Sequence, residues 1–410
     1  MATITTTQVR RTRFGPLSEA MGRPMFDYYL VLVSAALLAA LGALMVLSSS
    51  SVEAQARGLN PYYYAQRQAL FLAVSVPIAL VASRLNEKSL KALGWIGMVV
   101  SIVLLIAVFT PLGTDQGKGN RAWLDLGVMS VQPSEFAKLA LVVWAAAVLS
   151  TKQKLLDQPR HLLWPLLAGF MIIEALVLAE HDLGTAMVIG AIIFGILWVV
   201  GAPLRYIGAL LGAALLAVVA LVAYSPNRMT RIFAFLRPGV DDPNASQQPI
   251  SAVYALATGG WWGVGLGGSR QKWGGLYDGA KNDFVFAVLG EELGLVGALT
   301  VLLLFAALGW GGMRIAMKAE SMFVRITAAG ITAWLMFQTL CNVGVAMKML
   351  PVVGVPLPFI SAGGSALLSN LAAVGVLLAC ARLEPDARKA IEARRAKPRP
   401  RVTTVVDGGH

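Results

Sequence analysis

The feature that most constrains this chain is a series of apolar runs, each close to the length of a membrane span. A bilayer core of roughly 30 Å takes about twenty apolar residues of helix to cross. The runs cover about residues 28–48, 67–83, 91–110, 136–150, 162–180, 183–201, 206–223, 287–311, 324–347 and 364–381. The sequence therefore predicts an all-α polytopic membrane protein with about ten transmembrane helices.

Composition supports this class and excludes others. Of the 410 residues, 57% are hydrophobic and 14% are charged, whereas soluble domains usually carry about a quarter charged residues. The net charge of +12 lies largely in tails and short connections, where membrane orientation and anionic headgroups explain it, so we expect no nucleic-acid partner. Cys341 and Cys380 lie in apolar runs, and no HExxH pattern is present, which argues against a disulfide framework and a zinc enzyme.

Alternate short connections are rich in cations, and this predicts the orientation. These cations are Arg84, Lys88 and Lys91, then Lys152, Lys154 and Arg160, then Arg205, and finally Arg314, Lys318 and Arg325. The positive-inside rule places these connections and both termini in the cytoplasm. We therefore expect a basic cytoplasmic tail (1–25), a ten-helix membrane domain (26–382) and a second basic cytoplasmic tail (383–410).

On this topology the polar clusters lie on the outer side. The largest is a loop over residues 224–286, between the seventh and eighth helices, and it is too long for a simple turn. The others cover 113–135, 180–185 and 348–365. Transporters typically hold their key polar groups near the membrane midplane. Clustering at one face instead favours an enzyme that works at the outer surface.

Asp283, at the end of the large loop, is the candidate catalytic residue. Arg270, Lys272 and Lys281 precede it, next to a glycine-dense stretch whose N–H groups can approach an anion. Cations beside a carboxylate suit transfer from a diphosphate leaving group, because the carboxylate can take the proton of an attacking hydroxyl. The structural alternative is that Asp283 only caps the eighth helix.

The fourth helix begins with Gln132, Pro133, Ser134 and Glu135, and Lys138 follows. Glu135 and Lys138 are i, i+3 neighbours that can pair, either as a brace of the bundle or as part of a functional site. Ser134 or Gln132 can cap this helix.

Three further places carry candidate residues. Arg121 and Trp123 can hold a phosphate and a sugar or lipid, although interfacial anchoring explains Trp123 equally well. Asp182 starts the sixth helix, as a cap or as a site residue. The segment 351–365 cannot be regular helix and must be buried or line a cavity, and its glycines at the next helix start can bind an anion. Glu291 and Glu292 either bind a cation or pair with Lys348.

These motifs together resemble the SEDS family (shape, elongation, division and sporulation) of peptidoglycan glycosyltransferases. The similar pieces, in order, are Arg121-Ala122-Trp123, Gln132-Pro133-Ser134-Glu135, Asp182-Leu183-Gly184-Thr185, Gly263-Val264-Gly265-Leu266-Gly267, Asn282-Asp283-Phe284, Gly290-Glu291-Glu292-Leu293-Gly294, Asn342-Val343-Gly344 and Leu357-Pro358-Phe359-Ile360-Ser361-Ala362-Gly363-Gly364-Ser365. The resemblance covers roughly residues 25–385. It is strongest to the cell-division member, with the rod-shape member next. One departure is Lys281, where the family usually has His.

The resemblance implies that the chain joins lipid II into β-1,4 glycan strands at the outer face, with Asp283 as general base. The implied substrate-binding residues are Arg121, Trp123, Gln132, Ser134, Glu135, Lys138, Asp182, Arg270, Gln271, Lys272, Lys281, Ser361, Gly363, Gly364 and Ser365. A divalent cation, Mg²⁺ or Mn²⁺, can assist, with Asp283 and Glu292 as candidate ligands. The implied partners are an FtsI-like class B penicillin-binding protein and other divisome proteins, at the septum of a bacterial plasma membrane. A lipid II flippase and a divisome scaffold are the alternatives.

Overall fold

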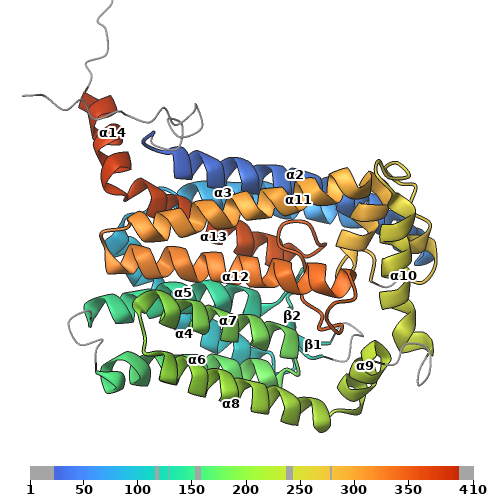
Figure 1. Ribbon diagram of the computed structural model, residues 1–410, viewed down its shortest axis with the longest axis horizontal. Helices are drawn as coiled ribbons and strands as arrows, with labels where there is room; N and C mark the ends of the chain where they lie inside the picture. Colours follow the sequence, from blue (N-terminus) through green and yellow to red (C-terminus); the bar gives the residue numbers. More distant parts are fainter. Residues whose placement is uncertain are drawn as a thin grey trace, which may run out of the picture.

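The computed structural model describes residues 23–115, 120–127, 129–152, 158–236, 243–277 and 279–396. Long helices lie side by side in one bundle (Figure 1). Those that match the predicted spans are α2 (Phe26–Ala56), α3 (Tyr63–Ala82), α4 (Glu87–Ala107), α5 (Pro133–Thr151), α6 (Pro159–Ala179), α7 (Leu183–Val200), α8 (Leu204–Ala223), α11 (Val285–Lys318), α12 (Met322–Ala346) and α13 (Gly364–Arg382). Within the described residues, nine of these have the length and hydropathy to cross a membrane, and α6 has a shorter apolar part, Leu163–Ala179. The predicted helical membrane fold is confirmed.

The polar clusters gather at one end of the bundle, which we call the loop end (Figure 1). It carries the small antiparallel sheet of β1 (Gly113–Thr114), β2 (Trp123–Asp125) and β3 (Ser130–Val131), together with α9 (Pro226–Leu236), α10 (Pro243–Gly259) and the 3-10 turn η2 (Gln271–Trp273). The start of α2 and the last helix, α14 (Pro385–Ala396), lie at the opposite end, the tail end. Residues 1–22 of the first predicted tail, residues 397–410 of the second, and Lys154 fall outside the described residues.

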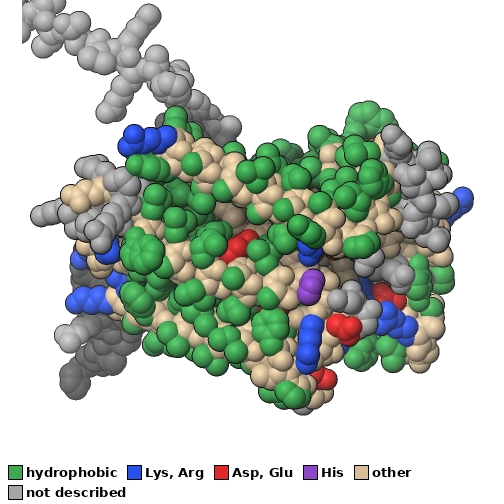
Figure 2. Space-filling model, turned by 90° about the horizontal axis from the view of Figure 1, so that it is seen from below, with side chains coloured by type: hydrophobic (Ala, Val, Ile, Leu, Met, Phe, Trp, Pro, Cys, Tyr) green, Lys and Arg blue, Asp and Glu red, His purple; other side chains and the backbone are tan. Residues whose placement is uncertain are grey.

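The core of the bundle is formed by α5, α12 and α13, whose apolar stretches are mostly buried. By contrast, α8 lies at the edge, with only 6% of its apolar stretch buried. Apolar side chains cover the face seen in Figure 2, and Lys and Arg side chains gather toward its two ends. This distribution is the one expected of helices whose outer faces contact lipid.

Two helices, α11 and α2, extend well beyond their apolar runs, and polar groups lie on the extensions. At the tail end α11 continues to Lys318, where Arg314 Nε lies 2.6 Å from Asp27 Oδ1 of α2 and Lys318 pairs with the same carboxylate. At the loop end α2 continues to Ala56 and includes the buried Glu53. The pattern of apolar residues alone does not report such extensions.

A break in α11 connects the glycine-dense stretch to the bundle. Gly294 has φ 67° and ψ −168°, a conformation that interrupts the helix. The loop replaces the lost helical hydrogen bonds: the N–H groups of Val264 and Gly265 donate to the carbonyls of Glu291 and Glu292 (2.9 and 3.1 Å), while those of Leu295 and Val296 donate to Gly260 and Trp261 (2.8 and 3.2 Å). Freed backbone groups at membrane depth need such partners. The glycine-dense stretch is therefore a fixed part of the loop end.

Candidate functional site

Asp283 lies at the loop end, half-buried, immediately before the first turn of α11. The helix begins at Val285, and Phe284 occupies the N-cap position with no side-chain capping bond. Asp283 therefore lies one residue before the N-cap position of α11.

Three consecutive carbonyls anchor the chain around Asp283. The carbonyl of Lys281 accepts from the N–H of Ala362 (2.8 Å), that of Asn282 accepts from Ser361 Oγ (2.7 Å), and that of Asp283 accepts from Asn342 Nδ2 (3.0 Å). The donors come from α12 and from the segment before α13. Residues far apart in the sequence thus fix the backbone of the candidate base.

The donors are themselves held by the proline-rich segment. Ser361 Oγ accepts from the N–H of Leu357 (2.8 Å), and Asn342 Nδ2 also donates to the carbonyl of Val355 (2.9 Å). Leu357, Phe359 and the following Ile360 are buried. Residues 355–361 are thus mostly buried, in line with the expectation that this non-helical segment is buried or lines a cavity, and the Ser361 hydroxyl bonds to the backbone here.

Lys281 is fixed through its side chain as well. Its Nζ lies 2.6 Å from Glu53 Oε2 and 3.7 Å from the centre of the Tyr64 ring. Glu53, at the end of α2, is 3% exposed and also pairs with Arg57 (2.8 Å). Sequence reasoning missed Glu53. The only local sign of it is a Glu followed four residues later by an Arg at the end of the first apolar run.

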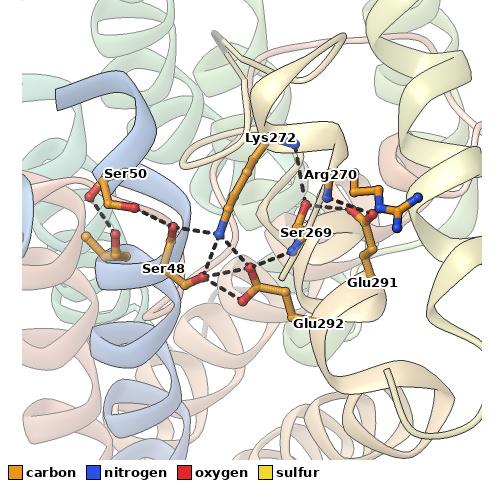
Figure 3. A network of polar contacts seen from close by, with 9 residues as sticks. Ser48, Ser50, Ser269, Arg270, Lys272, Glu291 and Glu292 are labelled. Atoms are coloured by element: carbon orange, nitrogen blue, oxygen red, sulfur yellow. Dashed lines mark hydrogen bonds and ion pairs between the residues drawn. The ribbon is translucent and has the colours of Figure 1, made fainter. Parts of the chain in front are cut away.

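Lys272 belongs to a buried network that joins η2, α2 and α11 (Figure 3). Its Nζ lies 2.9 Å from Glu292 Oε1 and 3.2 Å from the hydroxyl of Ser48, and that hydroxyl contacts both oxygens of Glu292 at 2.7 and 2.6 Å. Lys272 and Glu292 are almost wholly buried. The predicted ion pair between Glu292 and Lys348 is therefore wrong, because Glu292 pairs with Lys272.

The neighbouring Glu291 holds the loop from the other side. Its carboxylate accepts from Ser269 Oγ (2.5 Å) and from the backbone N–H of Arg270 (3.0 Å). Arg270 itself is exposed, and Gln271 is half-buried in η2. Of the predicted loop cations, Lys272 and Lys281 thus have carboxylate partners, and Arg270 is the one that faces solvent.

A second polar cluster lies between the core helices. Lys138 Nζ and Glu135 Oε1 are 2.8 Å apart, as predicted from their spacing, and Ser369 Oγ donates to the other Glu135 oxygen at 3.1 Å. The Lys138 ammonium also lies 5.0 Å from the Trp334 ring centre. These groups are buried, and Ser134, next to Glu135 in the sequence, has a buried hydroxyl with no hydrogen-bond partner within the described ranges.

Asp182 links this cluster to α7. Its Oδ1 accepts from the N–H of Thr185 (2.9 Å), so it caps α7 as predicted, and its Oδ2 accepts from Gln132 Nε2 (3.1 Å). Burial raises the pKa of the Asp182 carboxyl, and the hydrogen bonds from Thr185 oppose this rise. Gln132 occupies the N-cap position of α5 without capping it, because its side chain binds Asp182 instead. The Gln132 N–H donates to Ser365 Oγ at 3.1 Å, which adds α13 to the cluster.

Glu180, just after α6, was also missed by sequence reasoning. It is 1% exposed, and neither of its carboxylate oxygens has a hydrogen-bond partner among the residues that the structure describes. Burial raises the pKa of Glu180 to about 9, and the neighbouring Asp182 carboxylate adds to the rise. A carboxyl in such a place is held in its protonated form at neutral pH.

The remaining predicted site residues either bind backbone carbonyls or lie where elements pack together. Arg121 NH2 and Nε donate to the carbonyls of Thr110 (2.7 Å) and Gly113 (3.2 Å), and Trp123 is part of β2. Gly363 precedes α13. At Gly364 a Cβ would lie 2.2 Å from the ring of Phe71, so a larger residue here would require the Phe71 side chain of α3 to move.

Glu292 does not fit a divalent cation. The Lys272 ammonium and the Ser48 hydroxyl already occupy its oxygens, and within the described part of the chain no three His, Cys, Asp or Glu side chains converge. A cation at Asp283 stays a prediction.

Comparison with known proteins places this geometry in a family. The FtsW, RodA and SpoVE family, described as "Cell cycle protein", matches residues 28–385. The probable peptidoglycan glycosyltransferase FtsW of Mycobacterium tuberculosis is 37% identical over 94% of this chain and 73% of its own length. Stage V sporulation protein E of Bacillus subtilis is 36% identical over 87% of this chain and 97% of its own.

Solved structures agree with the sequence comparison. The rod shape determining protein RodA of Thermus thermophilus superposes with a TM-score of 0.61 at 26% identity, over 87% of this chain and 96% of that one. A chain of a peptidoglycan synthase complex superposes with a TM-score of 0.70 at 27% identity, over 86% of this chain and 97% of that one. With its ordered motifs on the same helical fold, this chain belongs to the FtsW, RodA and SpoVE family of multi-pass membrane proteins.

Proposed function

We propose that this chain is the peptidoglycan glycosyltransferase that joins lipid II into β-1,4 glycan strands at the outer membrane face, with Asp283 as general base. The observation that carries the proposal is the anchoring of three consecutive carbonyls, from Lys281 to Asp283, by groups from α12 and the segment before α13. A half-buried carboxylate on so constrained a backbone is preorganised for proton transfer. Its relatives named as peptidoglycan glycosyltransferases support the reaction class.

The chemistry is a single displacement. A sugar hydroxyl of the acceptor attacks the anomeric carbon of the donor, its proton passes to Asp283, and the bond to the diphosphate breaks with its electron pair on the leaving oxygen. One such step inverts an α-linked diphosphoryl sugar to a β-link and needs one base. Arg270, exposed on the loop beside η2, is the cation best placed to stabilise the departing charge, because Lys272 and Lys281 already have carboxylate partners.

The cluster of Glu135, Lys138 and Asp182 bears on the alternative, a lipid II flippase. A transporter would need these groups to change partners during its cycle. Here Glu135, Lys138 and Ser369 are bonded to one another in the core of the bundle, which favours a brace. This arrangement supports the enzyme over the transporter.

The test is polymerisation by the purified protein, with and without a class B penicillin-binding protein, on lipid II. Asp283→Asn is expected to fold and to lose strand formation by about 100-fold or more. Asp125→Asn is the matched control, since Asp125 is an exposed carboxylate of the same loop end. Full activity of Asp283→Asn would contradict the proposal, and movement of lipid II across liposomes without polymerisation would favour the flippase.

A divalent cation is proposed only at Asp283, in company with the diphosphate oxygens of the substrate. When bound, Mg²⁺ or Mn²⁺ would neutralise leaving-group charge. The test removes divalent metal with a chelator and then adds each metal back. We expect the polymerisation rate of wild type to depend on the metal. We expect the same metal dependence in folded Glu292→Gln, because Glu292 is not a ligand in this proposal.

The partners and the cellular place belong to the same proposal. The structural similarity to a chain of a peptidoglycan synthase complex supports a penicillin-binding partner. The relatives named FtsW support division in the plasma membrane over elongation. A fluorescent fusion is expected at the septum, and an exclusively sidewall signal would favour the rod-shape role.

A further inference from the structure

We infer that Glu53 is a positioning residue for the catalytic segment, acting through Lys281. The kinetic part of this inference rests on the proposed role of Asp283. Glu53 is at the end of α2, far in the sequence from the loop, and its carboxylate is 2.6 Å from Lys281 Nζ. Lys281 is two residues before Asp283, on the same short segment.

The environment makes this contact specific. Glu53 is 3% exposed, and the Lys281 side chain is 12% exposed, so water competes little with either charge. Tyr64 of α3 covers the ammonium with its ring at 3.7 Å, and its hydroxyl donates to Glu53 Oε1 at 3.4 Å. The pair therefore lies between α2, α3 and the loop, where one geometry satisfies all three groups.

Together with the backbone contacts, this pair completes a clamp. The carbonyls of the segment are held by Ala362, Ser361 and Asn342 on one side. The Lys281 side chain is held by Glu53 on another. Loss of the Glu53 charge removes this contact, so the Lys281 side chain is held less firmly and the segment that carries Asp283 shifts with it. A shift of about 1 Å in a catalytic group can reduce the rate about 100-fold.

The structural alternative is that the Glu53–Lys281 pair only stabilises the fold. A purely structural pair would change the fraction of folded protein and leave the turnover of the folded protein intact. A positioning pair changes kcat of folded protein while substrate binding, made elsewhere, changes little. The two interpretations are separated by kinetics normalised to folded protein.

The experiment uses full-length protein in detergent with lipid II and the partner protein. Glu53→Gln and Lys281→Met are each expected to lower kcat about 100-fold with KM within about threefold of wild type. Lys281→Arg keeps the pair and is expected within about fivefold of wild-type kcat. Glu87→Gln, which breaks the half-exposed Glu87–Lys91 pair of α4 (2.7 Å), is the matched control with unchanged kinetics.

A double variant keeps the test decisive. Glu53→Gln with Lys281→Met leaves no buried charge unpaired, because the Arg57 side chain that also contacts Glu53 is 58% exposed, so the variant remains available where Glu53→Gln alone does not fold. If the two residues act as one unit, its kcat equals that of the slower single variant, whereas independent losses would multiply. Multiplied losses, or a Glu53→Gln enzyme within twofold of wild-type kcat, would overturn the inference.

Hydrogen exchange gives a readout that does not depend on turnover. In Glu53→Gln the amides of residues 279–284 are expected to exchange faster, with those of the α5–α13 contact unchanged. If the amides of residues 279–284 exchange at the wild-type rate, Glu53 does not restrain this segment, and the inference is refuted whatever the kcat of the variant. Activity retained by Asp283→Asn would instead refute the catalytic assignment and leave the exchange result standing, so the two failures are distinguishable.

Discussion

At the scale of single residues, the partner of each buried carboxylate decides its chemistry. Glu292 is neutralised by Lys272, and Glu53 is neutralised by Arg57 and Lys281. Glu180 is equally buried and its carboxylate oxygens have no hydrogen-bond partner in the described part of the chain, so the neutral acid is its stable form. The same residue type thus acts as an ion-pair partner in two places and as a neutral acid in a third.

Glu180→Gln is expected to stabilise the protein at neutral and alkaline pH. The pKa of Glu180 is raised from 4.5 to about 9, so between these values the folded state holds a proton that the unfolded state has lost. Stability therefore falls as pH rises through this window. Removing the carboxyl is expected to raise the free energy of unfolding at pH 8.5 by on the order of 2 kcal/mol and to leave it unchanged at pH 4.5.

Thermal unfolding in detergent from pH 4.5 to 8.5 measures this difference. Glu320→Gln is the control, since Glu320 is exposed between α11 and α12. A Glu180→Gln variant with the same pH dependence as wild type would show that Glu180 is ionised in the fold.

Lys272→Met is expected to be strongly destabilising. It leaves the buried Glu292 carboxylate without its cation, and breaking a buried pair in this way typically costs about 3–5 kcal/mol. The double variant Lys272→Met with Glu292→Gln removes the unpaired charge and should recover part of that loss. Unfolding midpoints of the three proteins measure the effect, and a Lys272→Met midpoint equal to wild type would contradict it.

Sequence spacing predicts contacts along a helix and misses those across the fold. The Glu135–Lys138 pair and the Asp182 cap follow from i, i+3 geometry and are confirmed. The carboxylate partners of Lys272 and Lys281 come from other elements. From the sequence alone, both lysines could therefore be interpreted only as phosphate ligands. For the same reason the role of Ser361 in holding backbone was not predictable from its motif.

At the scale of elements, the spans were predictable and the interruptions were not. Runs of apolar residues report membrane helices because length and hydropathy are sufficient for them. The break in α11 is invisible to hydropathy, although Gly290 and Gly294 around two acidic residues are a sign of it. The helices α9 and α10 lie inside what the sequence shows only as a mixed loop.

Gly294→Ala is expected to destabilise the loop end. The φ and ψ of Gly294 fall in a region that side chains avoid, at a cost of about 1–3 kcal/mol, and an added Cβ would lie 2.4 Å from the backbone nitrogen of Gly263. Gly190→Ala in α7, where no described atom outside the helix's own backbone lies within 4 Å of an added Cβ, is the matched control and should be neutral or stabilising. Equal unfolding midpoints for the two variants would show that the break tolerates a side chain.

At the scale of the whole molecule, the rigid centre of the bundle is separate from the candidate site at the loop end. Buried helices α5, α12 and α13 form the rigid centre, and α8 lies at the edge with few contacts. The candidate site draws on α2, α11, α12 and the segment before α13, all of which meet at the loop end (Figure 1). The rigid centre therefore positions the site, while the tail end carries the charges that predict orientation.

The topology predicts opposite accessibility of the two ends. Trp262 is exposed on the glycine-dense stretch at the loop end, and Glu320 is exposed in the connection between α11 and α12. A membrane-impermeant maleimide added to intact cells should label Trp262→Cys and not Glu320→Cys, because the positive-inside rule places the second connection in the cytoplasm. Permeabilised cells, in which both variants should be labelled, are the control. Cys341 and Cys380 are buried and free, so wild type should give little background. Labelling of Glu320→Cys from outside would reverse the orientation and, with it, place Asp283 on the wrong side of the membrane for the proposed reaction.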